Sequence, residues 1–425
     1  MGRAPVPAAV AAYGRSMRDQ RLPTSPDFWR SPLRGTWFTS VLGLVLLAGI
    51  TVLFVTGLLS YAAYNPDLSP VNDQTPDKGL LGFYLFSWPT RPAWLYRLNQ
   101  GVHVTLGITL IPVLLAKLWS VVPKLFTLPP ARSLAHALER ISLLLLVGGG
   151  LFEFVTGVLN IQLDYVFPGS FYPLHFYGAW VFFAAFVAHA VLKLPAALRN
   201  VRGLREERGE LHAPRPDPPT VSRRGALGLV GGGSLLLFGT TVGHSFDGVA
   251  RQTAVLAPHG GSEPGSGPNG FQINKTAAYA RIDPAETAAD AWRLVLTGRT
   301  GTLRLSRADL ARLPLYSSAL PIACVEGWST SNQWWRGVRL RDLAALVGHD
   351  RPTDVYVESL QRHGAFRHAA LRANQVGDER SLLALYVNGE DLDPDHGFPA
   401  RVIVPAAPGV LNTKWVARLT FGDLR

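Results

Sequence analysis

A long stretch without a single charged side chain, from Trp37 to Ala62, most constrains what this chain can fold into. A helix of about 20 apolar residues spans the hydrocarbon core of a bilayer, and this stretch is long enough. Charged residues make up 17% of the chain and apolar residues 48%, a balance typical of membrane proteins. The same reasoning predicts three more spans and a weaker fifth, at about Leu98–Trp119, Ile141–Leu163, Tyr172–Leu192 and Gly225–Gly243.

Lysine and arginine concentrate on one side of these spans. They are frequent before the first span, between the second and third, and above all between the fourth and fifth, whereas segments 63–97 and 164–171 are poorer in them. By the positive-inside rule the amino terminus is cytoplasmic, and five crossings leave everything after Gly243 outside. We therefore expect a multi-pass protein of the cell membrane, in contact with lipid. The net charge of +11 then comes from the excess of Lys and Arg in the cytoplasmic segments, and we expect no nucleic-acid partner.

Two adjacent arginines, Arg223 and Arg224, stand immediately before the fifth span. The segment SRRGALGL at 222–229 resembles a twin-arginine export signal, which directs a route that carries folded domains. An ordinary basic anchor beside a membrane helix is the alternative.

Composition divides the chain into five parts, and the last part has short strand-like runs instead of long apolar spans. From residue 271 onward, short strand-like runs such as WRLVLTG and ARVIVPA alternate with turns and short helices, which predicts a soluble α+β domain. The parts are a cytoplasmic tail (1–34), a four-helix membrane bundle (35–200), a cytoplasmic hinge with the fifth helix (201–243), a linker rich in Gly, Pro and Ser (244–270) and the soluble domain (271–425).

Three histidines lie in the predicted membrane helices. His103 and His175 are both near the outer ends of their spans, so they sit at matching depth. Two imidazoles from neighbouring helices are a usual axial pair for a b-type haem. His189 lies fourteen residues after His175, about 21 Å along the helix and on the same face, a spacing that suits a second haem. The alternative for each of the three is a histidine that forms hydrogen bonds within the bundle or lies at the lipid headgroups.

The helical region resembles the membrane cytochrome b subunits of formate dehydrogenases and of nickel–iron hydrogenases. The resemblance covers residues 35–200 and rests on the four spans, on NQGVHVTLG in the second, and on the histidine spacing in PLHFYGAWVFFAAFVAHA. It implies that His103 and His175 bind an outer haem b. In that family a histidine of the first span completes an inner haem with the counterpart of His189, but no histidine precedes His103 here.

Two features of the inner half stay open. His189 is either a ligand of a second haem, with His136 as a candidate partner, or a lone second ligand to a single haem. Glu153, in the middle of the third span, is either a proton relay or quinone contact, or a neutral carboxylic acid hydrogen-bonded inside the bundle.

Cys324 is the only cysteine of the chain, which rules out an intrachain disulfide and any paired-cysteine metal site. A lone cysteine is often just a small buried apolar residue. Cys324, however, follows an apolar strand and precedes a Glu-Gly turn, in a domain placed outside the membrane where an idle thiol is liable to oxidation. A thiolate that binds a soft metal is a use for one cysteine that needs no second one.

The segment around Cys324, ACVEGWSTSNQWWRGVRLRDLAALV, resembles the cysteine signature of the sulfite oxidase family of molybdenum enzymes. A later block, LLALYVNGEDLDPDHGFPARVIVPAAPGVLNTKWVARLTF, resembles that family's second signature, with an Asn-Gly turn, a His-Gly-x-Pro-x-Arg element and a final Lys-Trp. Within that family, the two signatures resemble those of the bacterial methionine sulfoxide reductase catalytic subunits and of the sulfite oxidases proper. The resemblance implies that Cys324 binds molybdenum and that the molybdopterin contacts Asn274, Ser359, His396, Arg401, Asn412, Thr413 and Lys414.

Together these features predict a membrane-bound molybdenum oxidoreductase. Oxygen-atom transfer would take place at an extracytoplasmic molybdopterin centre, with an oxyanion or a sulfoxide as substrate. Electrons would be exchanged through haem b with the quinone pool or another redox protein. The alternatives differ in substrate, as a sulfite dehydrogenase or a sulfoxide reductase, or in class, as a haem-binding electron carrier whose outer domain has lost catalysis.

Overall fold

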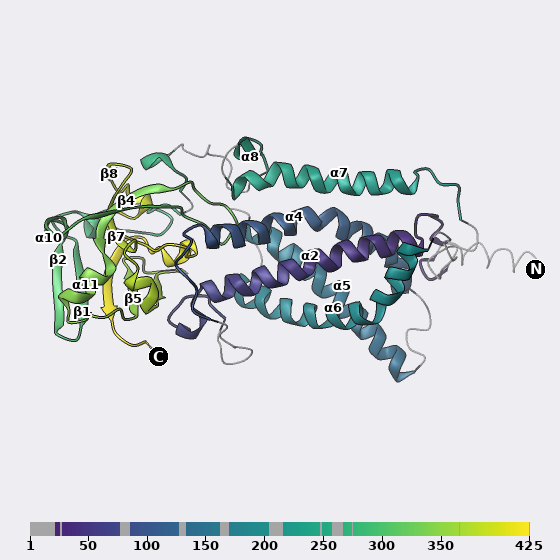
Figure 1. The fold of residues 1–425 in the computed structure, drawn as a ribbon, viewed down its shortest axis with the longest axis horizontal. Helices are drawn as coiled ribbons and strands as arrows, with labels where there is room; N and C mark the ends of the chain where they lie inside the picture. The colour runs from purple at the N-terminus through teal and green to yellow at the C-terminus, as the bar shows by residue number, and fades with distance from the viewer. Residues whose placement is uncertain are drawn as a thin grey trace, which may run out of the picture. The chain divides into compact units, whose positions relative to one another are not determined.

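A computed structural model of the chain describes residues 22–424 apart from 26–27, 77–85, 127–132, 162–169, 204–215, 247–248, 257–266, 274 and 365 (Figure 1). Within this described part, five helices are long and apolar enough to cross a membrane. This confirms the expected five apolar helices and is consistent with a membrane protein. The helices are α2 (Thr36–Ala63), α4 (Leu95–Val121), α5 (Leu134–Asn160), α6 (Phe171–Arg202) and α7 (Arg223–Thr241).

Two of these helices extend beyond the apolar spans predicted from the sequence. Helix α5 already begins at Leu134, and α6 continues past Leu192 to Arg202. The added residues are mostly good helix formers such as alanine and leucine, so the helix does not end where the apolar character ends. Arg199 and Arg202 in the last turn of α6 also interact favourably with the helix dipole.

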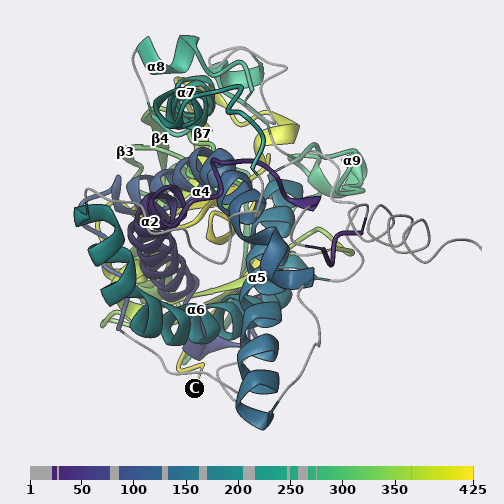
Figure 2. The same ribbon diagram turned by 90° about the vertical axis from the view of Figure 1, so that its right-hand side faces the viewer.

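Helices α2 and α4 lie side by side (Figures 1 and 2). Thr39 Oγ1 donates to Ser120 Oγ at 3.1 Å. Farther along, Thr56 Oγ1 lies 2.9 Å from His103 Nδ1. Direct hydrogen bonds between side chains therefore fix the rotation of these two helices about their axes.

The chain packs as two compact units. The first unit takes its described residues from 1–52, 107–155 and 178–237, and the second from 53–106, 156–177 and 238–425. The second unit therefore joins end segments of α2, α4, α5 and α6 to the carboxy-terminal domain. Cys324, His103 and His175 all belong to the second unit, whereas His189 belongs to the first.

Two five-stranded β-sheets form the carboxy-terminal domain. One has the order β2-β1-β10-β5-β6, and the other has β3-β4-β7-β8 with β9 beside β7. Every pairing is antiparallel except that of β1 with β10. The strands are β1 (Arg293–Gly298), β2 (Gly301–Ser306), β3 (Tyr316–Leu320), β4 (Gln333–Arg339), β5 (Val355–Ser359), β6 (His368–Leu371), β7 (Leu382–Val387), β8 (Glu390–Asp391), β9 (Arg401–Ile403) and β10 (Val416–Phe421).

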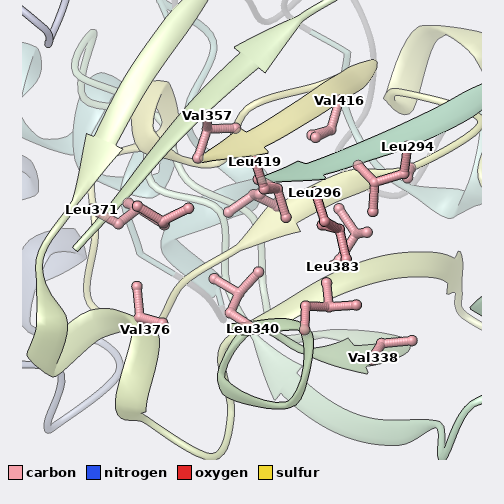
Figure 3. Close-up of a cluster of buried hydrophobic side chains, with 14 of the residues drawn as sticks. Leu294, Leu296, Val338, Leu340, Val357, Leu371, Val376, Leu383, Val416 and Leu419 are labelled. Carbon is pink, nitrogen blue, oxygen red and sulfur yellow. The ribbon is translucent and has the colours of Figure 1, made fainter. Parts of the chain in front are cut away.

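A cluster of buried leucines and valines joins the two sheets (Figure 3). Leu296 of β1 and Leu419 of β10 come from one sheet, and Leu383 of β7 comes from the other. Leu340, the first residue of helix α11 (Leu340–Leu346), fills the same cluster. These side chains are fully buried, and burying each stabilises the fold by about 1.5–3 kcal/mol. The predicted soluble α+β domain is confirmed.

A second buried cluster connects the helix ends of the second unit to the cysteine loop. Tyr64, which follows α2, and Tyr96 of α4 pack with Cys324, Val325 and Trp328. The loop is thus held by an apolar core that it shares with the transmembrane-type helices.

Candidate functional site

Cys324 lies in the loop between β3 and β4, and backbone hydrogen bonds fold this loop tightly. Its amide donates to the carbonyl of Trp328 at 2.8 Å, and the amide of Gly327 donates to the carbonyl of Cys324 at 3.1 Å. Gly327 has φ of +98°, a conformation that glycine adopts without strain. On the other side, the Gly409 amide donates to the carbonyl of Ala323 at 2.7 Å. The position of the sulfur is therefore set by two loops.

Cys324 is a buried residue, and its sulfur lies next to a carboxylate. Its Sγ is 3.4 Å from Glu326 Oε2, which also accepts a hydrogen bond of 3.0 Å from Trp328 Nε1. Burial and the charge of Glu326 raise the pKa of the Cys324 thiol well above its ordinary value. The protein alone thus favours the thiol, and a thiolate at this place needs a cation such as a metal to stabilise it.

A pocket opens beside Cys324 and gathers most of the predicted cofactor residues. Its wall includes Gln272, Lys275, Trp328, Gln361 and Trp415, which were not predicted. Asn274 lies outside the described residues, although Gln272 and Lys275 on either side of it line the pocket. The predicted residues that line it are Cys324, Ser359, His396, Arg401, Asn412, Thr413 and Lys414.

Four basic side chains line this pocket, those of Lys275, His396, Arg401 and Lys414, and no carboxylate is among its described lining residues. Burial lowers the pKa of Arg401 to about 9. Burial, and then the charge of Arg401, lower the pKa of Lys414 well below its usual value. Burial, Arg401 and Lys414 lower the pKa of His396 to about 3. An anionic ligand in this pocket would favour the charged forms and so raise each of these lowered pKa values.

Two polar atoms of the pocket wall are buried without a hydrogen-bond partner among the described protein atoms, namely Arg401 Nε and Thr413 Oγ1. Arg401 Nη1 donates to the carbonyl of His396 at 3.3 Å, and the guanidinium lies 5.5 Å from the ring centre of Trp335. Buried polar groups are nearly always paired, so these atoms indicate the place of a polar ligand. The residues present fit a molybdopterin with its phosphate.

Other pocket residues already have partners and shape the wall. Ser359 Oγ donates to the carbonyl of Lys414 at 2.8 Å and accepts from the Gln361 amide at 3.1 Å. Asn412 Oδ1 accepts from the Val404 amide at 2.8 Å. The Lys414 ammonium donates to the carbonyls of Lys275 and Asp395 at 2.8 and 2.7 Å.

His396 is fixed in one orientation. Its ring stacks on Phe271 with centres 3.7 Å apart, and its Nε2 lies 2.9 Å from the carbonyl oxygen of Pro268. Because a carbonyl only accepts, Nε2 carries the proton. The segment around Phe271 therefore closes one side of the pocket. Lys275 and Gln361, which the motifs did not identify, are sequence neighbours of the predicted Asn274 and Ser359.

The structure also brings His103 and His175 together. Their ring centres are 6.4 Å apart, with the ring planes at 82°. Thr56 Oγ1 lies 2.9 Å from His103 Nδ1, and Thr156 Oγ1 lies 3.2 Å from His175 Nδ1. Two imidazoles that bind one metal ion from opposite sides, each through a bond of about 2 Å, place their ring centres roughly 6 Å apart.

The features expected in the inner half have less support. His189 lies farther along α6, in the first unit, and the side chain of His136 is outside the described residues. Glu153 is buried and packs against Gly178. Among the described residues, no three His, Cys, Asp or Glu side chains gather into a metal-binding group. The described candidates for metal binding are thus a single cysteine and a pair of histidines.

Comparison with known proteins matches the carboxy-terminal domain. The family termed oxidoreductase molybdopterin binding domain matches residues 281–424. The mitochondrial sulfite oxidase of Rattus norvegicus is 33% identical over 158 residues, 31% of this chain and 29% of that protein. The uncharacterized oxidoreductase YuiH of Bacillus subtilis is 34% identical over 131 residues, 31% of this chain and 65% of that protein. The nitrate reductase [NAD(P)H] of Hordeum vulgare is 39% identical over 94 residues, 20% of this chain and 10% of that protein. The chain thus spans less than a third of the sulfite oxidase and about two thirds of YuiH.

Proposed function

We propose that this chain, whose residues 281–424 form a molybdopterin oxidoreductase domain with sulfite oxidases among its relatives, is a membrane-bound enzyme that carries its own cytochrome. The domain would bind molybdopterin, and molybdenum held there would supply two-electron oxygen-atom transfer. A b-type haem between α4 and α6 would supply one-electron transfer to the quinone pool or to another redox protein.

The observation that carries this proposal is the gathering of basic side chains in one pocket beside a lone buried cysteine. Arg401 lowers the pKa values of Lys414 and His396, and Lys414 lowers that of His396, while Asp395 offsets part of the effect on Lys414. A protein rarely buries cations together unless an anion binds them. The guanidinium of Arg401 suits a phosphate, which it can bind through two parallel hydrogen bonds.

In this proposal each residue has a defined task. The Cys324 thiolate would bind molybdenum, and Arg401 and Lys414 would bind the phosphate and hold the pterin. Thr413 Oγ1 would pair with the pterin. Ser359, Asn412 and His396 would keep the wall in shape. Asn274 is proposed as a further contact from the sequence motif alone.

The haem assignment rests on the separation of 6.4 Å between the rings of His103 and His175, which suits two axial ligands of one iron. His189 is a candidate ligand for a second haem. We place the carboxy-terminal domain outside the cell membrane on the distribution of Lys and Arg. Fusing both redox parts in one chain removes a diffusional encounter between them.

The substrate class follows from the relatives only in outline. Sulfite oxidases and a nitrate reductase are among the proteins matched, so a small oxyanion such as sulfite is the first candidate. A sulfoxide reductase, with electrons flowing in the opposite direction, is the second. A haem-binding electron carrier without catalysis is the alternative from another class.

Metal and haem analysis of the purified full-length chain tests the proposal. We expect one molybdenum per chain, together with haem that sulfite reduces or that a sulfoxide oxidises. Haem without molybdenum would favour the electron carrier. Molybdenum without haem would support the proposed enzyme activity and rule out the proposed cytochrome.

A further inference from the structure

The tetrapeptide Phe-Val-Thr-Gly occurs twice in the membrane-type helices. It covers residues 54–57 in α2 and residues 154–157 in α5. Each copy lies on the helix that precedes a histidine-bearing helix. Thr56 contacts His103, 47 residues later, and Thr156 contacts His175, 19 residues later. The two contacts are equivalent, so α2 with α4 and α5 with α6 form two copies of one arrangement.

The hydrogen bonds of Thr56 determine the tautomer of His103. A hydroxyl has a single proton to donate, and Thr56 Oγ1 donates it to the carbonyl of Leu53 at 3.0 Å. Toward His103 Nδ1, at 2.9 Å, the hydroxyl oxygen must therefore accept. Nδ1 then carries the proton, and Nε2 carries the lone pair that a metal needs. Thr156 stands in the same place relative to His175, with its Oγ1 3.2 Å from Nδ1.

The glycine after each threonine brings the helix backbone against the imidazole. A Cβ atom on Gly57 would lie 3.4 Å from His103 Cε1, and one on Gly157 would lie 3.8 Å from His175 Cε1. Each ring thus has a hydrogen-bond partner at Nδ1 and a glycine without a side chain near Cε1. The hydroxyl orients the ring, and the glycine leaves room for the ring beside the helix.

We propose that Thr56 and Thr156 are paired positioning residues, which hold His103 and His175 with Nε2 presented to one iron porphyrin. This inference rests on the proposed cytochrome function and deepens it. Partners that accept a hydrogen bond from a ligating histidine raise its basicity, and their loss typically weakens metal binding about 10–100-fold. A more basic ligand stabilises the more highly charged ferric iron, so removing the acceptor raises the midpoint potential.

The test uses full-length protein purified from membranes. Thr56→Val and Thr156→Val remove the acceptors with little change in volume, and Thr56→Ser and Thr156→Ser restore them. Thr51→Val is the matched control, because Thr51 Oγ1 donates to Leu47 O at 2.7 Å in the same helix without a described contact to a histidine. The readouts are haem per chain, the low-spin absorption and paramagnetic resonance spectra, the midpoint potential, and molybdenum per chain as a check on folding.

We expect both valine variants to bind haem about 10–100-fold more weakly and to show a higher midpoint potential in the haem that remains. The serine variants and Thr51→Val should match the wild type. Valine variants with the haem content and midpoint potential of the wild type would overturn the assignment of Thr56 and Thr156 alone. A wild-type chain that holds molybdenum but no haem would overturn the cytochrome function, and this assignment with it.

Discussion

Gln100 Nε2 donates a hydrogen bond of 2.5 Å to the carbonyl oxygen of Val325, the residue that follows Cys324. Gln100 stands three residues before His103 in α4, which is nearly one helical turn. The backbone of Gly327 also packs against Val104, so closely that a Cβ on Gly327 would lie 2.8 Å from the side chain of Val104. The loop that carries the cysteine therefore rests on the turn of α4 that carries the first haem-ligand candidate.

We expect Gln100→Leu to slow electron exchange between the two proposed redox centres. The substitution removes the hydrogen bond and leaves the buried carbonyl of Val325 without that donor, at a local cost of about 1–3 kcal/mol, which loosens the contact. The measurement is the rate at which haem, reduced by a light flash in the absence of substrate, re-equilibrates with molybdenum. Asn200→Leu is the control, since it removes a comparable hydrogen bond, from the side-chain amide of Asn200 to Ser40 Oγ, in the first unit. An unaltered rate in Gln100→Leu would contradict the role of this contact.

Cys324→Ala should abolish turnover and leave the haem spectrum unchanged. The sulfur is the only thiolate that the chain can offer, and the histidine pair does not depend on it. Steady-state assays with artificial electron donors and acceptors, alongside an absorption spectrum, measure both effects. Cys324→Ser serves as the conservative control, and we expect it to be inactive as well, because a hydroxyl is a poor ligand for a soft metal. If Cys324→Ala still turned over substrate, the Cys324 thiolate would not be required for the reaction.

Arg401→Met should stabilise the fold of the cofactor-free protein and weaken its binding of the molybdenum cofactor. In cofactor-free protein the guanidinium is a buried cation without a carboxylate among the described residues of its pocket wall. Replacing even a paired buried charge with apolar side chains can stabilise a fold by about 1–4 kcal/mol, and a buried cation without its anion is more costly than a pair. We therefore expect a higher melting temperature for the cofactor-free variant and less molybdenum per chain for the variant made with cofactor. If both quantities fell together, Arg401 would be supporting the fold rather than an anion.

The stability of the cofactor-free protein should fall in mild acid. His396 has a pKa of about 3 in the folded protein, against an ordinary 6.5. Between these values the unfolded chain binds a proton that the folded chain does not, so the free energy of unfolding decreases as the pH falls through this window, by on the order of a few kcal/mol. Denaturant unfolding at a series of pH values measures this. His396→Gln keeps a donor toward Pro268 but cannot titrate, and its profile should be flatter.

Asp67→Ala should destabilise the second unit. Asp67 forms an ion pair with Arg372, and the two side chains are only 10% and 5% exposed. Removing one partner of a buried pair costs about 3–5 kcal/mol. Thermal unfolding followed by tryptophan fluorescence gives the size of the effect. Glu379→Ala breaks the exposed pair with Arg91 at 3.4 Å and should change stability by less than about 1 kcal/mol; equal effects of the two substitutions would show that burial does not matter here.

Local patterns in the sequence predicted what depends on local structure. The uncharged run around Leu46 predicts a helix, and Asn388-Gly389 predicts the tight turn between β7 and β8, where both residues have positive φ. The motif resemblance predicted seven residues that do line one pocket. Helix ends were missed at Leu134 and Arg202, because helix propensity outlasts the apolar span.

Contacts between distant segments could not be predicted in this way. Thr56 and His103 are 47 residues apart, and Gln100 and Val325 are 225 apart. Each pair meets only because helices and loops pack in a particular rotation, which no local pattern encodes. The same holds for the charge of the pocket, since the sequence neighbours of Arg401 and Lys414 do not reveal that the two side chains will line one pocket.

Strand β10 lies between β1 and β5 and pairs in parallel with β1, so the middle of that sheet is synthesised after all of its other strands. The pocket wall formed by Asn412, Thr413 and Lys414 immediately precedes it. A nascent chain in which these residues have not yet emerged from the ribosome cannot contain the finished cavity. A pterin can therefore be held only after synthesis has passed β10.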